Sequence, residues 1–140
     1  MSKLYKPRLR SFEKASNQRH ITDKDRFLYK KQDHESKYRI NIIGAGTMGM
    51  EHMYVATLLG EAQIYGIYDQ EIHSLDIAEK EYEKYSSRKL FRYNNLKSAC
   101  EDPNVDALFI CTPNYTHLDV LKVAIESKKP IFLEKPMATT

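Results

Sequence analysis

Tryptophan is absent from this sequence of 140 residues, and cysteine occurs only at Cys100 and Cys111. Neither cysteine has metal-ligand spacing around it, so the sequence predicts no metal site and no disulfide framework. We expect Cys111, at the end of an apolar run, to be a small buried side chain rather than a nucleophile. No apolar run approaches the roughly 20 residues that a membrane span needs, and the N-terminus lacks the apolar segment of a signal peptide. A reduced cytoplasmic protein without a membrane partner is therefore expected.

Negative charge is scarce in the first part of the chain. Residues 1–39 carry 12 Lys/Arg against 5 Asp/Glu, whereas residues 40–140 carry 10 against 14. Apolar residues in this first part follow no helical or strand period, so we predict a separate basic N-terminal extension over residues 1–38. It could be a solvated arm, a subunit contact in a homo-oligomer or a nucleic-acid tail. The interspersed acidic residues argue against a nucleic-acid partner, because a phosphate-binding segment keeps its positive charge continuous.

A glycine-rich turn, Gly44-Ala45-Gly46-Thr47-Met48-Gly49, follows a short apolar run and precedes a helix-like stretch. In this spacing Gly44 permits a tight strand-to-helix turn, Gly46 lets a pyrophosphate approach the backbone, and Gly49 lets the helix pack close to the strand. The amides at the helix start, including those of Thr47 and Met48, would point at the phosphates, where the helix dipole favours negative charge. The P-loop spacing is missing, which argues against phosphoryl transfer.

Asp69 lies 20 residues after Gly49 and directly after the apolar run 64–68. An acidic side chain at this place accepts hydrogen bonds from a ribose diol, so the sequence predicts a dinucleotide site. No Lys or Arg stands near Asp69 to meet a 2′-phosphate, and the carboxylate would repel one, so NAD is expected to bind better than NADP. The alternative is a Rossmann-like unit that has lost its nucleotide.

Apolar periodicity predicts alternating strands and helices from residue 39 onward. The expected strands are about 39–43, 63–68, 90–93, 107–111 and 130–133, and the expected helices are about 47–59, 72–85, 95–101 and one that opens at Thr116. The run 107–111 is continuously apolar, as a parallel strand buried on both faces should be. We expect the Thr116 hydroxyl to cap its helix, with Asp119 three residues on. This order predicts an α/β domain over residues 39–140, a doubly wound parallel sheet of the Rossmann type between two helical layers.

Four stretches should meet beyond the carboxyl ends of the strands, where such sheets bind ligands. They are Gly44 to Gly49, Asp69, Thr112-Pro113-Asn114, and Glu134-Lys135-Pro136. At this edge Lys135 would be a cation beside a bound nicotinamide, able to hydrogen-bond a substrate hydroxyl or share in proton transfer. It could equally be a surface lysine paired with Glu134. His117 could touch the cofactor, whereas His52 is expected to be a structural histidine.

From Arg39 onward the sequence resembles the N-terminal domain of the glucose-fructose oxidoreductase, inositol dehydrogenase and MocA (Gfo/Idh/MocA) family. The matching pieces are the glycine-rich turn with His52, Asp69, Thr112-Pro113-Asn114 with His117, and Glu134-Lys135-Pro136. The resemblance implies an NAD(P)-dependent oxidoreductase acting on the CH–OH group of a sugar, cyclitol or related secondary alcohol. It gives Lys135 the catalytic or substrate-orienting role and places Thr112 and Asn114 on the nicotinamide side. It adds His117, Glu134 and Lys135 to the residues expected to line the cofactor.

The sequence departs from the family pattern in two places. Ser127-Lys128-Lys129-Pro130 stands where the family usually has a glycine, which suggests only a different turn. The family's second domain, which carries the substrate site and an Asp-x-x-x-His pair, is not among these 140 residues. The resemblance therefore implies the cofactor half of such an enzyme, as a fragment, a truncated product or a subunit with a separate C-terminal half. A non-catalytic NAD-binding or regulatory module is the alternative.

Overall fold

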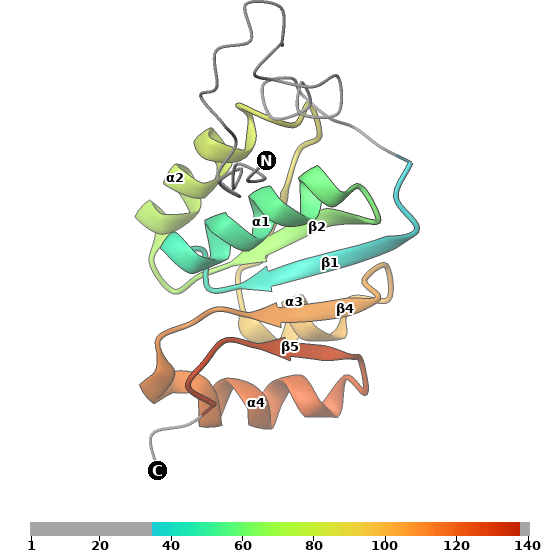
Figure 1. Cartoon of the computed structure of the whole chain (residues 1–140). Coiled ribbons are helices and arrows are strands. Elements are labelled where there is room, and N and C mark those ends of the chain that lie inside the picture. Colours follow the sequence, from blue (N-terminus) through green and yellow to red (C-terminus); the bar gives the residue numbers. More distant parts are fainter. Residues whose placement is uncertain (1–34, 138–140) are drawn as a thin grey trace, which may run out of the picture.

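The computed structural model describes residues 35–137, so the extension predicted over residues 1–38 lies outside the described residues except at its end. The described chain forms a parallel sheet with the strand order β3-β2-β1-β4-β5 (Figure 1). The strands are β1 (Tyr38–Ile43), β2 (Ala62–Tyr68), β3 (Phe91–Arg92), β4 (Ala107–Ile110) and β5 (Ile131–Leu133). The helices are α1 (Thr47–Leu59), α2 (Ile72–Tyr82), α3 (Leu96–Glu101), the 3₁₀ turn η2 (Asn114–Thr116) and α4 (His117–Glu126).

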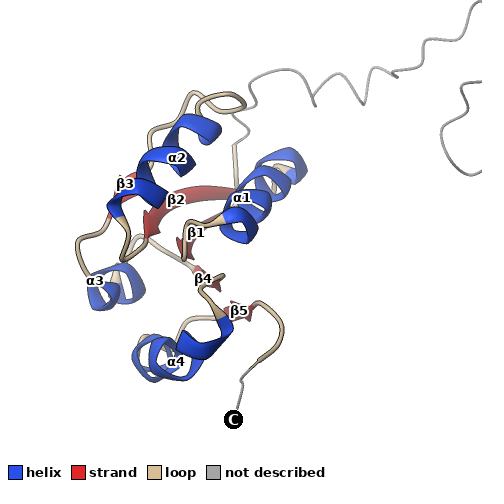
Figure 2. Cartoon of the chain, turned by 90° about the vertical axis from the view of Figure 1, so that its left-hand side faces the viewer, coloured by secondary structure: helices blue, strands red, loops and turns tan. Residues whose placement is uncertain are grey.

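Helices cover both faces of this sheet. The pair α1 and α2 lies on one face, and α3 and α4 lie on the other (Figure 2). Each face has its own apolar core: Ile42 packs with Met53 and other buried residues on the first face, while Ile43 packs with Leu108 and others on the second. In the central strand β1 the successive residues Ile42 and Ile43 are both fully buried, because helices cover both faces of the sheet. The predicted doubly wound, three-layer α/β fold is confirmed.

The register of the strands aligns their carboxyl ends. Ile43 of β1 pairs with Tyr68 of β2 and with Ile110 of β4, and Ile110 pairs with Leu133 of β5. The residues that follow these strands therefore lie along one edge of the sheet: Gly44, Asp69, Cys111 and Glu134. The sequence predicted this convergence, and below we call this side of the sheet the carboxyl edge.

Two local expectations were wrong. Helix α2 ends at Tyr82 rather than near residue 85, because the chain then tightens into turns in which the Tyr85 amide donates to the Tyr82 carbonyl. The Thr116 hydroxyl caps nothing: it donates to the carbonyl oxygen of Pro113 at 2.7 Å. The short turn η2 before α4 places Thr116 in helical backbone geometry, so its side chain faces back along the chain.

No helix within residues 35–137 is both long enough and apolar enough to cross a membrane.

The end of α1 and the start of α3 show common helix caps. Gly60 ends α1 in the left-handed conformation, with φ of 76°, and its amide donates to the Ala56 carbonyl. Asn95 begins α3 with a side-chain cap to the Ser98 amide at 2.8 Å.

Candidate functional site

The turn after β1 can be built only with glycine at its first position. Gly44 has a φ of 96°, and a Cβ atom there would lie 2.6 Å from the Thr112 amide nitrogen. The Gly44 amide donates to the Tyr68 carbonyl oxygen at 2.8 Å. The turn is thus wedged between the chain leaving β2 and the chain leaving β4, which explains why a side chain cannot be accommodated.

The start of α1 is open to solvent. A Cβ on buried Gly49 would overlap the Gly44 carbonyl, so this glycine lets the helix press against the turn. Gly46 has free space instead, because no atom lies within 4 Å of an added Cβ. The first helical bond is donated by the Met50 amide to the Gly46 carbonyl, so the amides of exposed Thr47 and Met48 have no partner within the helix. No acidic residue occupies this first turn, which leaves an anion-binding helix start.

Asp69 is fixed beside this turn through both of its carboxylate oxygens. Oδ2 accepts the Ala45 amide at 2.8 Å, and Oδ1 accepts the Glu71 amide at 2.9 Å. Each oxygen keeps further acceptor capacity, because a carboxylate offers about four lone-pair sites. A cavity opens next to Asp69, lined among others by Glu71, Thr112, Pro113 and Thr116. No Lys or Arg lines this cavity within the described part of the chain.

Thr112 presents a polar atom that is unsatisfied within residues 35–137. Its Oγ1 is buried and makes no hydrogen bond, although Thr112 lines the cavity beside Asp69. Half-buried Asn114 begins the turn η2 two residues later, after Pro113. An unpartnered hydroxyl at the carboxyl edge fits a bound polar ligand, since buried polar groups are normally hydrogen-bonded.

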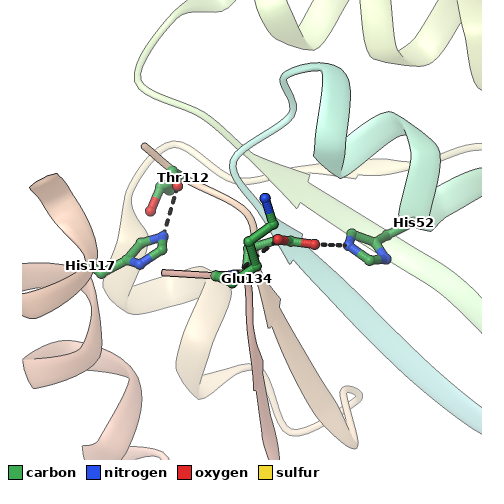
Figure 3. Close-up of polar contacts among 5 residues, drawn as sticks. His52, Thr112, His117 and Glu134 are labelled. Carbon is green, nitrogen blue, oxygen red and sulfur yellow. Dashed lines mark hydrogen bonds and ion pairs between the residues drawn. The ribbon is translucent and has the colours of Figure 1, made fainter. Parts of the chain in front are cut away.

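His117 is almost completely buried, with 1% of its surface exposed. Its Nε2 lies 2.8 Å from the Thr112 carbonyl oxygen (Figure 3). Its Nδ1 lies 3.0 Å from the Pro136 carbonyl oxygen and 3.2 Å from that of Met137. The ring therefore joins the segment after β4 to the segment after β5. The contact between His117 and cofactor that the sequence suggested stays a prediction.

The turn after β5 exposes Lys135 and engages Glu134. Glu134 Oε1 lies 2.7 Å from His52 Nε2, and Oε2 accepts the Lys135 amide at 3.0 Å (Figure 3). The His52 hydrogen bond, helped by the Lys135 amide, holds the pKa of Glu134 below its ordinary value. Within residues 35–137 no ion pair joins the Lys135 ammonium to Glu134. The Lys135 charge nevertheless helps to lower the pKa of Glu134, and both roles suggested for Lys135 stay predictions.

The cysteines have no reactive surroundings. Cys100 is fully buried, and burial raises the pKa of its thiol to about 11. Cys111 is half-buried, and burial with the nearby Glu134 charge raises its pKa to about 12. Both groups are thiols at neutral pH, as expected of small packing residues. No group of three or more His, Cys, Asp or Glu within residues 35–137 could hold a metal ion.

Sequence reasoning missed two features of this edge. The Ala45 amide fixes Asp69, but an alanine between glycines gives no signal for a backbone contact. His52 was expected to be a satisfied structural histidine, but its partner, Glu134, lies 82 positions away in the sequence and was not predicted. The only available signal for His52 was its place three residues after Gly49, one helical turn along α1.

These features define a class of protein. An open helix start behind Gly46, an acid fixed at the end of β2 and an unpartnered Thr112 hydroxyl meet at the carboxyl edge, as in dinucleotide-binding Rossmann domains. The residues present therefore fit a nicotinamide dinucleotide. Thr47 and Met48 would meet the pyrophosphate, Asp69 the ribose, and Thr112 the nicotinamide side.

Comparison with known proteins agrees with this class. The model of an oxidoreductase family with an NAD-binding Rossmann fold (GFO_IDH_MocA) matches residues 38–140. The chain therefore belongs to the Gfo/Idh/MocA family of oxidoreductases, as its NAD-binding Rossmann domain.

The similar proteins include several inositol dehydrogenases. The myo-inositol 2-dehydrogenase of Thermotoga maritima is 32% identical over 100 residues, which cover 71% of this chain and 28% of that protein. The inositol 2-dehydrogenase of Acidothermus cellulolyticus is 31% identical over 103 residues, covering 73% and 29%. The crystal structure of the myo-inositol dehydrogenase from Lactobacillus casei, in complex with NAD(H) and myo-inositol, matches with a TM-score of 0.65 and 27% identity, covering 74% and 30%. The chain thus spans less than a third of the length of these proteins.

Proposed function

We propose that this chain supplies the cofactor-binding half of an NAD-dependent oxidoreductase that acts on a secondary alcohol of a cyclitol or sugar. The observation that carries the proposal is the meeting of the glycine-rich turn, Asp69, Thr112 and Lys135 at one edge of the sheet. When bound, the nicotinamide ring supplies hydride transfer, and the chain's own residues hold and orient the reactants.

Residues of the β1–α1–β2 unit hold the cofactor in this proposal. The amides at the start of α1 bind the pyrophosphate, where the helix dipole favours negative charge. Asp69 accepts hydrogen bonds from a ribose diol with the lone pairs left by the Ala45 and Glu71 amides. A 2′-phosphate would meet the Asp69 carboxylate and no cation lining the cavity, so NAD binds better than NADP.

Residues after β4 and β5 face the nicotinamide side. Thr112 Oγ1 and the half-buried Asn114 offer polar groups to the ligand, and His117 holds their segment against the turn after β5. Exposed Lys135 is the catalytic residue: its ammonium donates a hydrogen bond to the substrate hydroxyl and stabilises the charge that develops on that oxygen. Glu134 lies at the base of the same turn and supports it.

Substrate choice and the remaining proton transfer are assigned to residues outside 35–137. The matched regions cover only 28% and 29% of the similar dehydrogenases, and the family resemblance places the substrate site and an Asp-x-x-x-His pair in a second domain. That domain would be contributed by further residues of the same protein or by a separate C-terminal subunit. A binding module without catalysis is the other candidate, because Glu134 and His52 beside the Lys135 turn contact each other, and His117 contacts backbone carbonyls.

Calorimetric titration of the 140-residue chain with NAD and with NADP tests the binding half of this proposal. We expect saturable NAD binding and weaker NADP binding; absence of NAD binding would contradict the function. Adding myo-inositol and watching for NADH tests the catalytic half. We expect the 140-residue chain to bind NAD without measurable turnover, because the substrate site is assigned to a second domain. In a longer form that carries this domain, Lys135→Ala should cut turnover strongly and leave NAD affinity within a few-fold. Robust turnover by the 140-residue chain would contradict this assignment of roles.

A further inference from the structure

The contact between His52 and Glu134 joins the cofactor-binding helix to the turn that carries Lys135. His52 lies one turn after Gly49 on α1, and Glu134 is the first residue after β5. Their atoms Nε2 and Oε1 are 2.7 Å apart, and the side chains are 22% and 13% exposed. Because an ionised carboxylate can only accept hydrogen bonds, Nε2 must carry the proton that is shared.

Two phenylalanine rings fix the orientation of the imidazole. The His52 ring makes edge contacts with two phenylalanine rings. The ring centroids are 5.9 Å apart for Phe109 and 5.0 Å apart for Phe132. The two phenylalanines pack against each other at 4.8 Å, across β4 and β5. The His52 ring is therefore packed against both phenylalanines while its Nε2 faces Glu134 Oε1.

The second oxygen of Glu134 acts on Lys135 itself. Oε2 accepts the Lys135 backbone amide at 3.0 Å, so one carboxylate links the His52 ring to the peptide from which the lysine side chain departs. The Lys135 ammonium forms no ion pair with Glu134 within residues 35–137, although its charge helps to lower the pKa of Glu134. A partly exposed pair of this kind contributes little to stability, so its main consequence is the direction it gives the turn.

We propose that His52 and Glu134 are positioning residues that hold the Lys135 turn in register with the cofactor-binding start of α1. The proposal rests on the proposed function for the role of Lys135. A shift of α1 by cofactor would be passed to Lys135 through a contact shorter than 3 Å. Loss of the pair would displace the lysine and leave the glycine-rich turn intact. This would matter for catalysis, because a displacement of about 1 Å at a reacting group can cost roughly 100-fold in rate.

A matched pair of variants tests this link in the chain as it exists. His52→Gln keeps an N–H donor at the reach of Nε2, whereas His52→Asn has the same amide one methylene shorter. Lys84→Met, which removes an exposed ion pair to Glu81, is the control because it lies far from the carboxyl edge. The measurement is the backbone amide resonance of Lys135 by ¹H–¹⁵N NMR, with its hydrogen-exchange rate, before and after NAD.

Without NAD, we expect the Lys135 amide to exchange faster in His52→Asn than in the wild type, and His52→Gln to restore slow exchange. If the Lys135 amide exchanges at the same rate in the wild type and in all variants, the proposal is overturned. The imidazole ¹⁵N shifts of the wild type should report an Nε2–H tautomer, and an Nδ1–H tautomer would also overturn it.

With NAD, the wild type and His52→Gln should show a defined shift of the Lys135 amide. His52→Asn should bind NAD within a few-fold of the wild type but lose that shift. If the wild type fails to bind NAD, the proposed function is refuted, whereas the exchange comparison without NAD still decides whether His52 holds the turn.

Discussion

The two ends of the carboxyl edge are built in different ways. In the glycine half, residues 38–71, backbone groups determine the geometry. Gly44 has a positive φ, the amides at the start of α1 are open, and two backbone amides donate hydrogen bonds to Asp69. In the lysine half, residues 107–137, side chains join backbone segments that are distant in the sequence, such as His117 to Pro136. Substitutions in the glycine half should therefore destabilise the fold through steric conflict. Substitutions in the lysine half should destabilise it through the loss of hydrogen bonds.

The largest effect is expected at Gly44. Gly44→Ala forces a side chain into a positive-φ residue and against the Thr112 amide. We expect a loss of unfolding free energy of roughly 3 kcal/mol or more, measured by urea unfolding. Gly46→Ala is the control: its Cβ meets open space, so stability should hardly change while NAD affinity falls. Equal destabilisation by both substitutions would break the steric account of the glycine half.

His117→Ala is the corresponding test of the lysine half. It opens a cavity and leaves the carbonyl oxygens of Thr112, Pro136 and Met137 without the ring that contacts them. We expect a loss of roughly 2–3 kcal/mol in the same unfolding assay. His117→Gln keeps one donor and should recover part of this loss. An alanine variant as stable as the wild type would show that these carbonyls do not depend on the imidazole.

Asp69→Ala should weaken NAD binding by about tenfold, which is ~1.4 kcal/mol, because a charge-assisted acceptor for the ribose is lost. NADP affinity should fall less, since removing the carboxylate also removes its repulsion of a 2′-phosphate, and the gap between the cofactors narrows. Asp69→Asn, which keeps an acceptor for one amide, separates loss of the ribose contact from loss of the turn. An unchanged preference for NAD in Asp69→Ala would place cofactor selection elsewhere.

A smaller, pH-dependent effect is expected for Glu134. Its folded-state pKa is lowered from 4.5 by the His52 hydrogen bond, so the folded state favours the carboxylate. Its stabilising contribution is therefore complete above the ordinary value of 4.5 and is lost as the pH falls through the lowered folded pKa. Urea midpoints of the wild type and Glu134→Gln should differ near neutral pH and converge on acidification. A difference that stays constant across this range would contradict the ionised pair.

The smallest effect is expected outside both halves. If residues 1–34 are a solvated arm, as their charge and scattered apolar residues predict, their deletion should leave the melting temperature nearly unchanged. A large drop would instead indicate that Phe12, Phe27 and Leu28 dock on the domain or on a second subunit.

The sequence was sufficient for the order of the elements and for placing the glycine-rich turn and Asp69 at one edge, because both depend on local patterns. It did not predict the contact between the Ala45 amide and Asp69. Alternating apolar runs predicted the order of strands and helices, and the spacing from Gly49 to Asp69 predicted the acid at the end of β2. The end of α2 and the contact made by the Thr116 hydroxyl were mispredicted, since each depends on turns that compete with helical geometry. The joining of His52 to Glu134 required the register of β1, β4 and β5, which no local pattern contains.

The position of β1 between β2 and β4 sets the time at which the edge can assemble during synthesis. Asp106 accepts the Arg39 amide and Thr112 confines Gly44, so the turn after β1 acquires its surroundings only when residues nearly 70 positions later have left the ribosome. Non-local pairing of this kind slows folding, because loop-closure entropy is lost before the contacts form. NAD can then stabilise only a chain that is complete through β4, because a ligand stabilises the folded state that it binds. Cofactor present during translation would therefore bind and stabilise the domain only late in its synthesis.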